Sequence, residues 1–198
     1  MDFCSYGDRA VMALITPKNI ATSKLTEGSS FLPPAGSVVQ TVQGVMHGTA
    51  TFTSASMTDI SSDLNLTITP TSASNKLLLT GFITLANQTD GCANIFLSVN
   101  GVNVGYNNSA SGNTTAHTGL NYHYLSGKGE PNWYESWGCP INWLTGAIGT
   151  TSPIVCKPRI NNSDDSGVTI YVNRGKRDAG SLWTARYVST FTVQEIKA

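Results

Sequence analysis

The sequence predicts an all-β protein, an antiparallel β-sandwich that is jelly-roll-like and follows an extended N-terminal arm. Three observations support this fold class. Short apolar runs recur from residue 37 to the end, turn residues separate them, and the polar positions hold Thr, Ser and Asn rather than Glu and Lys. Such side chains favour strands and tight turns over the surfaces of helices.

The composition excludes several classes of protein. Only 12% of the 198 residues are charged, and 12 Lys+Arg against 12 Asp+Glu give a formal net charge of zero. A dedicated nucleic-acid binder carries a basic face, so we expect no nucleic-acid partner. No apolar run approaches the roughly 18 residues of a membrane span, and no signal peptide is recognisable, so we expect no membrane partner.

The first 36 residues differ from the rest and predict an arm with a linker. They contain a short apolar patch, Ala10–Ile15, and a stretch rich in Ser, Gly and Pro, Ser23–Gly36. A patch this short forms no stable helix alone and needs a partner surface on which to bury itself. We therefore predict an arm and linker over 1–36, which would attach to a partner surface, and a jelly-roll-like domain over 37–198.

Strands are predicted in chain order from period-two alternation. Leu64–Thr69 places three apolar side chains on one face, and Pro70 ends it because proline cannot donate to a ladder. Asn100-Gly101 separates two alternating runs and predicts a hairpin, because both turn positions take positive φ. The predicted strands are Val38–Gln43, Leu64–Thr69, Lys76–Ala86, Asn94–Val99, Val102–Val104, Ile141–Ile148, Ile154–Ile160, Val168–Asn173 and Trp183–Ile196.

Two further segments matter for the architecture. Tyr106–Gly138 is rich in Asn, Ser, Gly and Thr, then in aromatic residues, and predicts a loop region. Lys76–Ala86 is nearly all apolar, so we expect the core to cover one face and a neighbouring subunit the other. Regularly spaced strands predict a jelly roll most simply, with another Greek-key sandwich as the alternative.

Four stretches stand out together by their order and spacing: Pro34–Gln40, Leu66–Leu78, Ile170–Arg174 and Val188–Ile196. In this order they resemble a β-sandwich domain common in structural proteins of tailed bacteriophages, especially tail-fibre-like proteins of marine and freshwater phages. The resemblance covers about Pro34 to Ala198. It implies a jelly-roll-like domain that usually assembles as a trimer and carries no catalysis.

The chain departs from that pattern because tail fibres usually carry long shafts, whereas about 36 residues precede the domain here. We therefore expect a small homotrimeric appendage on the virion surface, made in the host cytoplasm. Capsid decoration or cement and a short head or tail fibre are the competing versions, with the major capsid protein or tail or vertex proteins as partners. The candidate attachment residues are Val11, Met12, Leu14 and Ile15.

The densest aromatic segment is Trp133-Tyr134-Glu135-Ser136-Trp137. Aromatic faces stack on sugar rings and a carboxylate accepts from sugar hydroxyls, so a host-surface glycan-binding adhesin is the alternative function. Its candidate residues are Trp133, Tyr134, Glu135 and Trp137. Packing under a loop or at a subunit interface is the competing interpretation, since large aromatics bury the most area there.

The only basic cluster is Arg174, Lys176 and Arg177. At a hairpin tip it would contact phosphates, acidic glycans or an acidic patch on a capsid partner. The alternative is an ordinary solvated turn between two strands.

No pattern in the sequence indicates catalysis, a metal or a cofactor. Asp164-Asp165 lacks the spacing of a calcium loop, and no GxSxG, P-loop or GxGxxG motif is present. The cysteines form no CxxC pair, so we expect free and mostly buried thiols, with a Cys139–Cys156 disulfide as the alternative. We therefore expect no enzyme, no cofactor and no metal. The cysteines are Cys4, Cys92, Cys139 and Cys156.

Overall fold

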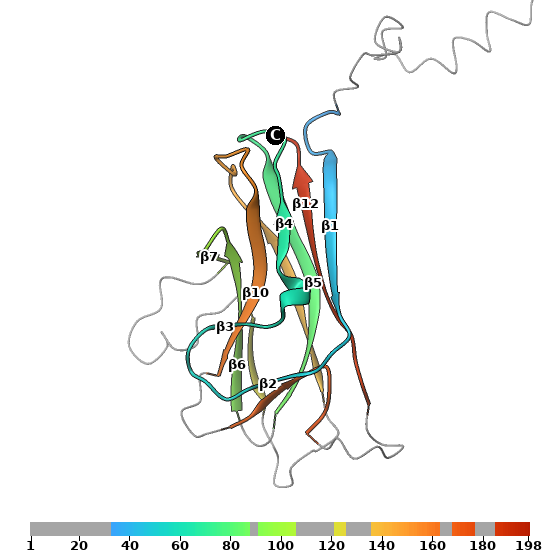
Figure 1. The fold of residues 1–198 in the computed structure, drawn as a ribbon, viewed down its shortest axis with the longest axis vertical. Coiled ribbons are helices and arrows are strands. Elements are labelled where there is room, and N and C mark those ends of the chain that lie inside the picture. The colour runs from blue at the N-terminus through green and yellow to red at the C-terminus, as the bar shows by residue number, and fades with distance from the viewer. Residues whose placement is uncertain (1–32, 88–90, 106–120, 126–135, 163–167, 177–184) are drawn as a thin grey trace, which may run out of the picture. The chain divides into compact units, whose positions relative to one another are not determined.

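The computed structural model describes residues 33–87, 91–105, 121–125, 136–162, 168–176 and 185–198. The chain divides into two units between Pro34 and Ala35, and the second unit holds the strands. Its described residues form twelve strands and one 3-10 turn, η2 (Ser62–Leu64). The strands make two antiparallel sheets (Figure 1), which confirms the predicted all-β sandwich.

The first sheet is built around the long strand β5. One edge of β5 pairs with β12 and then with β11, and the other edge pairs with β9. β1 pairs with the far side of β12, and β2 with the far side of β11. The strands are β1 (Val38–Met46), β2 (Ala50–Phe52), β5 (Lys76–Asn87), β9 (Trp137–Leu144), β11 (Ile170–Val172) and β12 (Ser189–Ile196).

The second sheet is built around the pair β10 and β6. The outer edge of β10 pairs with β3 and β4, and the outer edge of β6 pairs with β7 and β8. The strands are β3 (Thr58–Asp59), β4 (Leu66–Ile68), β6 (Gly91–Val99), β7 (Val102–Val104), β8 (Asn121–Leu125) and β10 (Ile154–Asn162).

The strand order across the two sheets is that of a jelly roll. β1, β12, β5 and β9 follow one another in the first sheet, and β4, β10, β6 and β8 in the second. The first and last strands of the chain, β1 and β12, are therefore neighbours, as two Greek keys in facing sheets require. Of the two topologies that the sequence allowed, the simpler one is observed.

The core lies between the sheets and consists of the inward side chains of each alternating strand. β5 contributes Leu77, Leu79 and Ile83, and β12 contributes Phe191 and Val193, all of them fully buried. A fully buried side chain of this size stabilises the fold by about 1.5–3 kcal/mol. The described residues after 36 thus form a hydrophobic cluster that both sheets share.

The predicted hairpin is confirmed, but one predicted strand is shorter than expected. Asn100 and Gly101 have φ of 50° and 83° and join β6 to β7. The expected strand Leu64–Thr69 begins only at Leu66, because the Ser61 hydroxyl accepts from the Asp63 N–H and caps a 3-10 turn before it. Leu64 is still fully buried.

The prediction of a loop over Tyr106–Gly138 is wrong in part. Asn121–Leu125 forms β8, paired with β6, and β9 already begins at Trp137. Frequent Asn and Thr around these residues concealed a strand of only five residues, Asn-Tyr-His-Tyr-Leu. Strands this short depend on their neighbours more than on their own sequence.

Other strand limits shift because the backbone finds other partners. The strand predicted over Ile141–Ile148 ends at Leu144, and the Ile148 N–H donates to the Asn75 carbonyl. The last strand begins at Ser189 rather than at Trp183, which lies outside the described residues. β11 covers Ile170–Val172 of the expected Val168–Asn173, and the very short β2 and β3 were not predicted.

Candidate functional site

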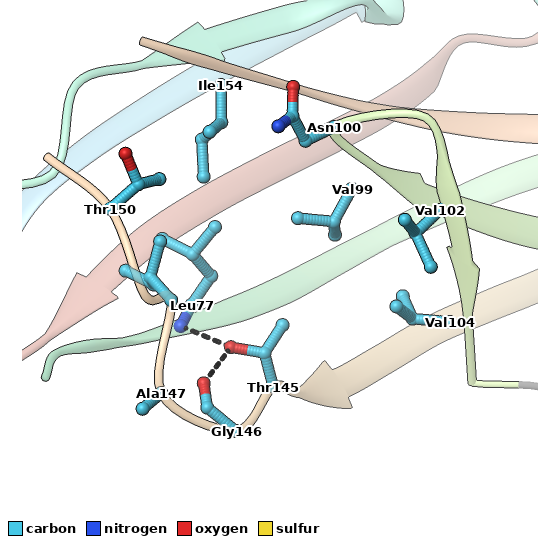
Figure 2. Close-up of a pocket in the computed structure, with 11 residues that line it drawn as sticks. Leu77, Val99, Asn100, Val102, Val104, Thr145, Gly146, Ala147, Thr150 and Ile154 are labelled. Carbon is cyan, nitrogen blue, oxygen red and sulfur yellow. Dashed lines mark hydrogen bonds between the residues drawn. The ribbon is translucent and has the colours of Figure 1, made fainter. Parts of the chain in front are cut away.

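One end of the sandwich carries a pocket of about 380 Å³. Its walls come from the start of β5, the β6–β7 hairpin, the loop 145–150 and the start of β10, as Figure 2 shows. The chain ends at the same end of the sandwich: the Ala198 N–H donates to Asn75, which precedes β5. A pocket of this volume is in the size range of small-molecule sites.

The pocket has the chemistry of an aliphatic surface. Leu77, Val99 and Ile154 contribute apolar side chains, and the other lining residues are uncharged. The Thr145 hydroxyl accepts from the Leu77 N–H at 2.8 Å and donates to the Gly146 carbonyl at 2.7 Å (Figure 2). The lining thus holds no acid, base or thiol, and its best-placed hydroxyl is already engaged by the backbone.

Beside this end, a buried carboxylate joins three separate parts of the chain. Glu195, near the end of β12, has no exposed surface. One carboxylate oxygen accepts from Thr71 through both its N–H and its hydroxyl, at 2.8 and 2.9 Å, and from the Asn75 amide at 2.6 Å. The other accepts from the Gln40 amide at 2.6 Å. We call Glu195 and these three donors the Glu195 cluster.

The Glu195 cluster favours the ionised carboxylate. Burial alone raises the pKa of Glu195, but the hydrogen bonds from Asn75, Gln40 and Thr71 outweigh burial, so the pKa lies below its ordinary value. A buried charge is tolerated when it is fully hydrogen-bonded. The cluster therefore ties β12 to β1 and to the β4–β5 corner.

A second polar cluster holds the other end of β12. Asn173 follows β11, is fully buried and has φ of 60°. Its amide donates to the Met46 carbonyl at 2.8 Å and to the Gly48 carbonyl at 2.9 Å, and its oxygen accepts from the Ser189 hydroxyl at 2.6 Å. The same hydroxyl accepts from the Thr84 N–H at 3.1 Å. We call this set the Asn173 cluster.

The two clusters unite the four stretches that carried the sequence resemblance. Gln40 belongs to the first stretch, Thr71 and Asn75 to the second, Asn173 to the third, and Glu195 to the fourth. Sequence reasoning took these stretches as a pattern without assigning their polar residues. Continuing the alternation of Phe191 and Val193 would have placed Glu195 inward as well.

The outer faces of the two sheets differ in charge. On the second sheet, Asp59 of β3 binds Lys157 at 2.6 Å and Arg159 at 3.0 Å, both from β10. Burial raises the pKa of Asp59, but the two cations outweigh it and hold the pKa below its usual value. On the first sheet, the outward positions of β5 and β9 are uncharged except for Lys76, at the start of β5.

The predicted aromatic site is only partly described. Trp137 lies in β9, half-buried, where it pairs with Leu85 of β5. Trp133, Tyr134 and Glu135 lie outside the described residues, as do the candidate attachment residues of the arm. The glycan-binding and attachment hypotheses therefore stay predictions.

The basic cluster is described for two of its three members. The Arg174 guanidinium lies 4.3 Å from the centre of the Tyr171 ring and donates to the Thr51 hydroxyl at 3.4 Å. Lys176 is half-buried, and Arg177 lies outside the described residues. At least Arg174 is thus packed against its own chain by a cation–π contact.

Cys139 and Cys156 are both free and buried. Burial raises the pKa of the Cys139 and Cys156 thiols to about 12. Cys139 lies in β9 of the first sheet and Cys156 in β10 of the second, and no disulfide joins them. The alternative of a Cys139–Cys156 disulfide is therefore wrong. Cys4 lies outside the described residues.

Among the described residues, no three His, Cys, Asp or Glu side chains converge as metal ligands. Within the same residues no helix has the length and apolar character needed to cross a membrane.

No family model matches the chain, and no curated protein matches it. Among solved structures the chain is similar to infectious bursal disease virus, Gx strain, at 13% identity and a TM-score of 0.37, over 80% of this chain and 36% of that chain. It is also similar to the VP2 subviral particle of infectious bursal disease virus at 12% identity and a TM-score of 0.35, over 81% and 42%. The chain spans less than half the length of these viral chains.

Proposed function

We propose that the chain is a non-enzymatic structural protein of a tailed-bacteriophage virion. In this proposal it forms a homotrimeric appendage on the particle surface, docked by residues 1–36, either as capsid decoration or cement or as a short head or tail fibre. The observation that carries the proposal is the convergence of all four resemblance stretches on the Glu195 and Asn173 clusters. These clusters hold the ends of β12, so the shared pattern encodes a structural framework.

The chemistry of the pocket supports the non-enzymatic part of the proposal. A hydrolytic or group-transfer site needs a nucleophile or an acid–base pair within reach of a substrate. The lining offers aliphatic side chains and hydroxyls, of which Thr145 is held by its own backbone. The buried carboxylate of Glu195 is engaged by four hydrogen bonds and faces no solvent.

The deciding experiment is quantitative mass spectrometry of purified particles of the phage that encodes the chain. We expect the protein on intact particles and accessible to antibody. Hundreds of copies would identify capsid decoration, whereas a handful to dozens would identify a tail or vertex fibre. Absence from the particles would overturn the proposal.

A truncation tests the role of the arm. A variant that lacks residues 1–36 is expected to stay trimeric and soluble but to lose binding to particles that lack the protein. Retained binding would contradict docking through the arm. Binding of the full chain to isolated host-surface glycans, lost in Trp133→Ala or Trp137→Ala, would support the adhesin instead.

A further inference from the structure

The outer surface of β5 and β9 forms a continuous uncharged face. Alternation along β5 buries Leu77, Leu79 and Ile83 and turns the residues between them outward. The register of β9 brings Leu144 opposite Leu78, Asn142 opposite Thr80 and Pro140 opposite Phe82. We define the β5–β9 face as these six residues: Leu78, Thr80, Phe82, Pro140, Asn142 and Leu144.

The apolar side chains of this face are well exposed for their size. Leu144 is 51% exposed and Phe82 is 47% exposed, although both lie in regular strands. The distal atoms of the Phe82 ring lie over Gly138, where a Cβ would overlap them. Because Gly138 has no side chain, the Phe82 ring lies directly on the sheet, and its other surface is exposed.

Next to β5, strands β12 and β1 extend the uncharged surface with polar side chains that hydrogen-bond to one another. Gln43 donates to Thr192 at 3.0 Å, and Gln194 donates to Thr41 at 3.3 Å, across β1 and β12. The opposite sheet is different, because its outer side carries Lys157, Arg159 and Asp59. On the first sheet the charges lie apart from this surface, with Arg174 over Tyr171 of β11 and Lys76 at the start of β5. The uncharged part of the first sheet, over β5, β9 and β12, is therefore suited to an uncharged partner.

We propose that the β5–β9 face is the contact between copies of this chain and lies toward the three-fold axis of the trimer. The proposal rests on the proposed function and names the surface that makes its homotrimer. When two copies of this uncharged face meet, no like charges repel each other. The face also has the composition of an interface centre, where charged residues are depleted and aromatic residues are enriched. Three-fold closure then ends the association.

The contact joins side chains rather than continuing the sheet. Among the described strands β9 pairs only with β5 and so forms one edge of the first sheet, and Pro140 has no N–H to donate. A strand edge with proline resists pairing with a further strand. Copies therefore meet through Phe82, Leu78 and Leu144 rather than by edge-to-edge hydrogen bonds.

The test introduces one charge into each side of the sandwich. Phe82→Glu places a carboxylate in the proposed contact, and Val155→Glu is the matched control, since Val155 is a 39% exposed apolar residue on the outer side of β10. The full chain of each is studied by sedimentation equilibrium. We expect the wild type and Val155→Glu to be trimeric and the mass of Phe82→Glu to fall roughly threefold.

Each other outcome has a distinct meaning. A monomeric wild type would contradict the trimer of the proposed function itself. A trimeric wild type with a trimeric Phe82→Glu would leave that function standing and overturn the β5–β9 contact. Dissociation by Val155→Glu alone would place the contact on the opposite sheet.

A labelling experiment covers the case in which Phe82→Glu does not fold. Asn142→Cys and Thr67→Cys put a thiol on the β5–β9 face and on the outer side of the second sheet, and both positions are exposed in the single chain. Peptide mass spectrometry follows maleimide labelling of the intact oligomer. We expect Thr67→Cys to be labelled and Asn142→Cys to be protected, and equal labelling would overturn the proposal.

Discussion

Asn173 combines a left-handed backbone with a fully buried side chain that makes three hydrogen bonds. Only glycine, and asparagine at some cost, takes such a φ readily. We expect Asn173→Gly to lower the free energy of unfolding by about 2–4 kcal/mol, because two carbonyls and the Ser189 hydroxyl lose their partner. Asn173→Ala should lose roughly 1 kcal/mol more through backbone strain. Urea unfolding of the three proteins measures both differences.

Asn100 offers a matched control for Asn173. It has the same left-handed backbone, with φ of 50°, but its side chain is exposed at the hairpin turn. Asn100→Gly should therefore change the free energy of unfolding by less than about 0.5 kcal/mol. An equal loss in both glycine variants would show that the hydrogen bonds of Asn173 contribute nothing.

The lowered pKa of Glu195 leads us to expect that the protein loses stability in acid. Its pKa in the folded chain lies below the ordinary value near 4.5, so the unfolded chain binds more protons in that range and stability rises with pH. The contribution is complete above the unfolded pKa and disappears as pH falls through the folded pKa. Glu195→Gln should be less stable than wild type by about 1.5–3 kcal/mol at pH 7.

Glu195→Gln also shows whether Glu195 is the group that causes this pH dependence. The difference in free energy of unfolding between wild type and Glu195→Gln should shrink as the pH is lowered from 5, because protonation removes the charge that the variant lacks. Asp59 and the remaining carboxyls are present in both proteins and cancel. A constant difference from pH 7 to pH 3 would contradict an ionised Glu195 in the fold.

The sequence predicts some single residues and not others. The turn at Asn100-Gly101 was identifiable because it requires positive φ at two adjacent positions, and these two residue types favour positive φ themselves. The partners of Glu195 and Asn173 were not identifiable. Those of Glu195 lie 120 to 155 positions away, and those of Asn173 are Met46 at the end of β1, Gly48 after it and Ser189 at the start of β12. Hydrogen bonds over such separations follow from the topology, which a single sequence shows only as spacing.

At the scale of the element, glycines set how closely β5 approaches its neighbours. A Cβ on Gly81 would overlap the Thr190 carbonyl of β12, which is backbone and cannot rotate away. Gly81→Ala should therefore separate the two strands and destabilise the protein by about 1–3 kcal/mol. Gly48→Ala is the control, because nothing lies within 4 Å of its added Cβ.

Thermal unfolding followed by circular dichroism compares the two variants. We expect a lower Tm for Gly81→Ala and little change for Gly48→Ala. Equal Tm values would mean that β5 and β12 adjust to the methyl group without loss.

Long strands with many apolar residues were predicted better than those that depend on their neighbours. β10 alternates over its nine residues and β5 is mostly apolar over its twelve, and both appear within two residues of their expected limits. β2, β3 and β8 have two to five residues, too few for periodicity to decide. Each pairs with a longer strand that supplies its hydrogen bonds, so its formation is a property of the sheet.

At the scale of the whole molecule, the two sheets share one core and differ in their outer sides. Leu77, Phe191 and Ile160 belong to one hydrophobic cluster although they come from different sheets. The ion pairs of Asp59 lie on the second sheet, whereas the β5–β9 face of the first sheet is uncharged. A protein with this asymmetry has one side that is favourable to water and one that is open to association.

The shared core predicts that the two described thiols become reactive together. Cys139 lies on the inner side of the first sheet and Cys156 on the inner side of the second, and burial raises both pKa values to about 12. A thiol with so high a pKa is almost entirely protonated at pH 8. Burial also keeps the reagent away from both sulfur atoms. Neither sheet can expose its cysteine without opening the cluster that holds the other. We therefore expect both to be modified at one common rate, set by global unfolding, when maleimide labelling is followed residue by residue with mass spectrometry. Raising the urea concentration should accelerate both equally, whereas faster modification of one would show that its sheet opens separately.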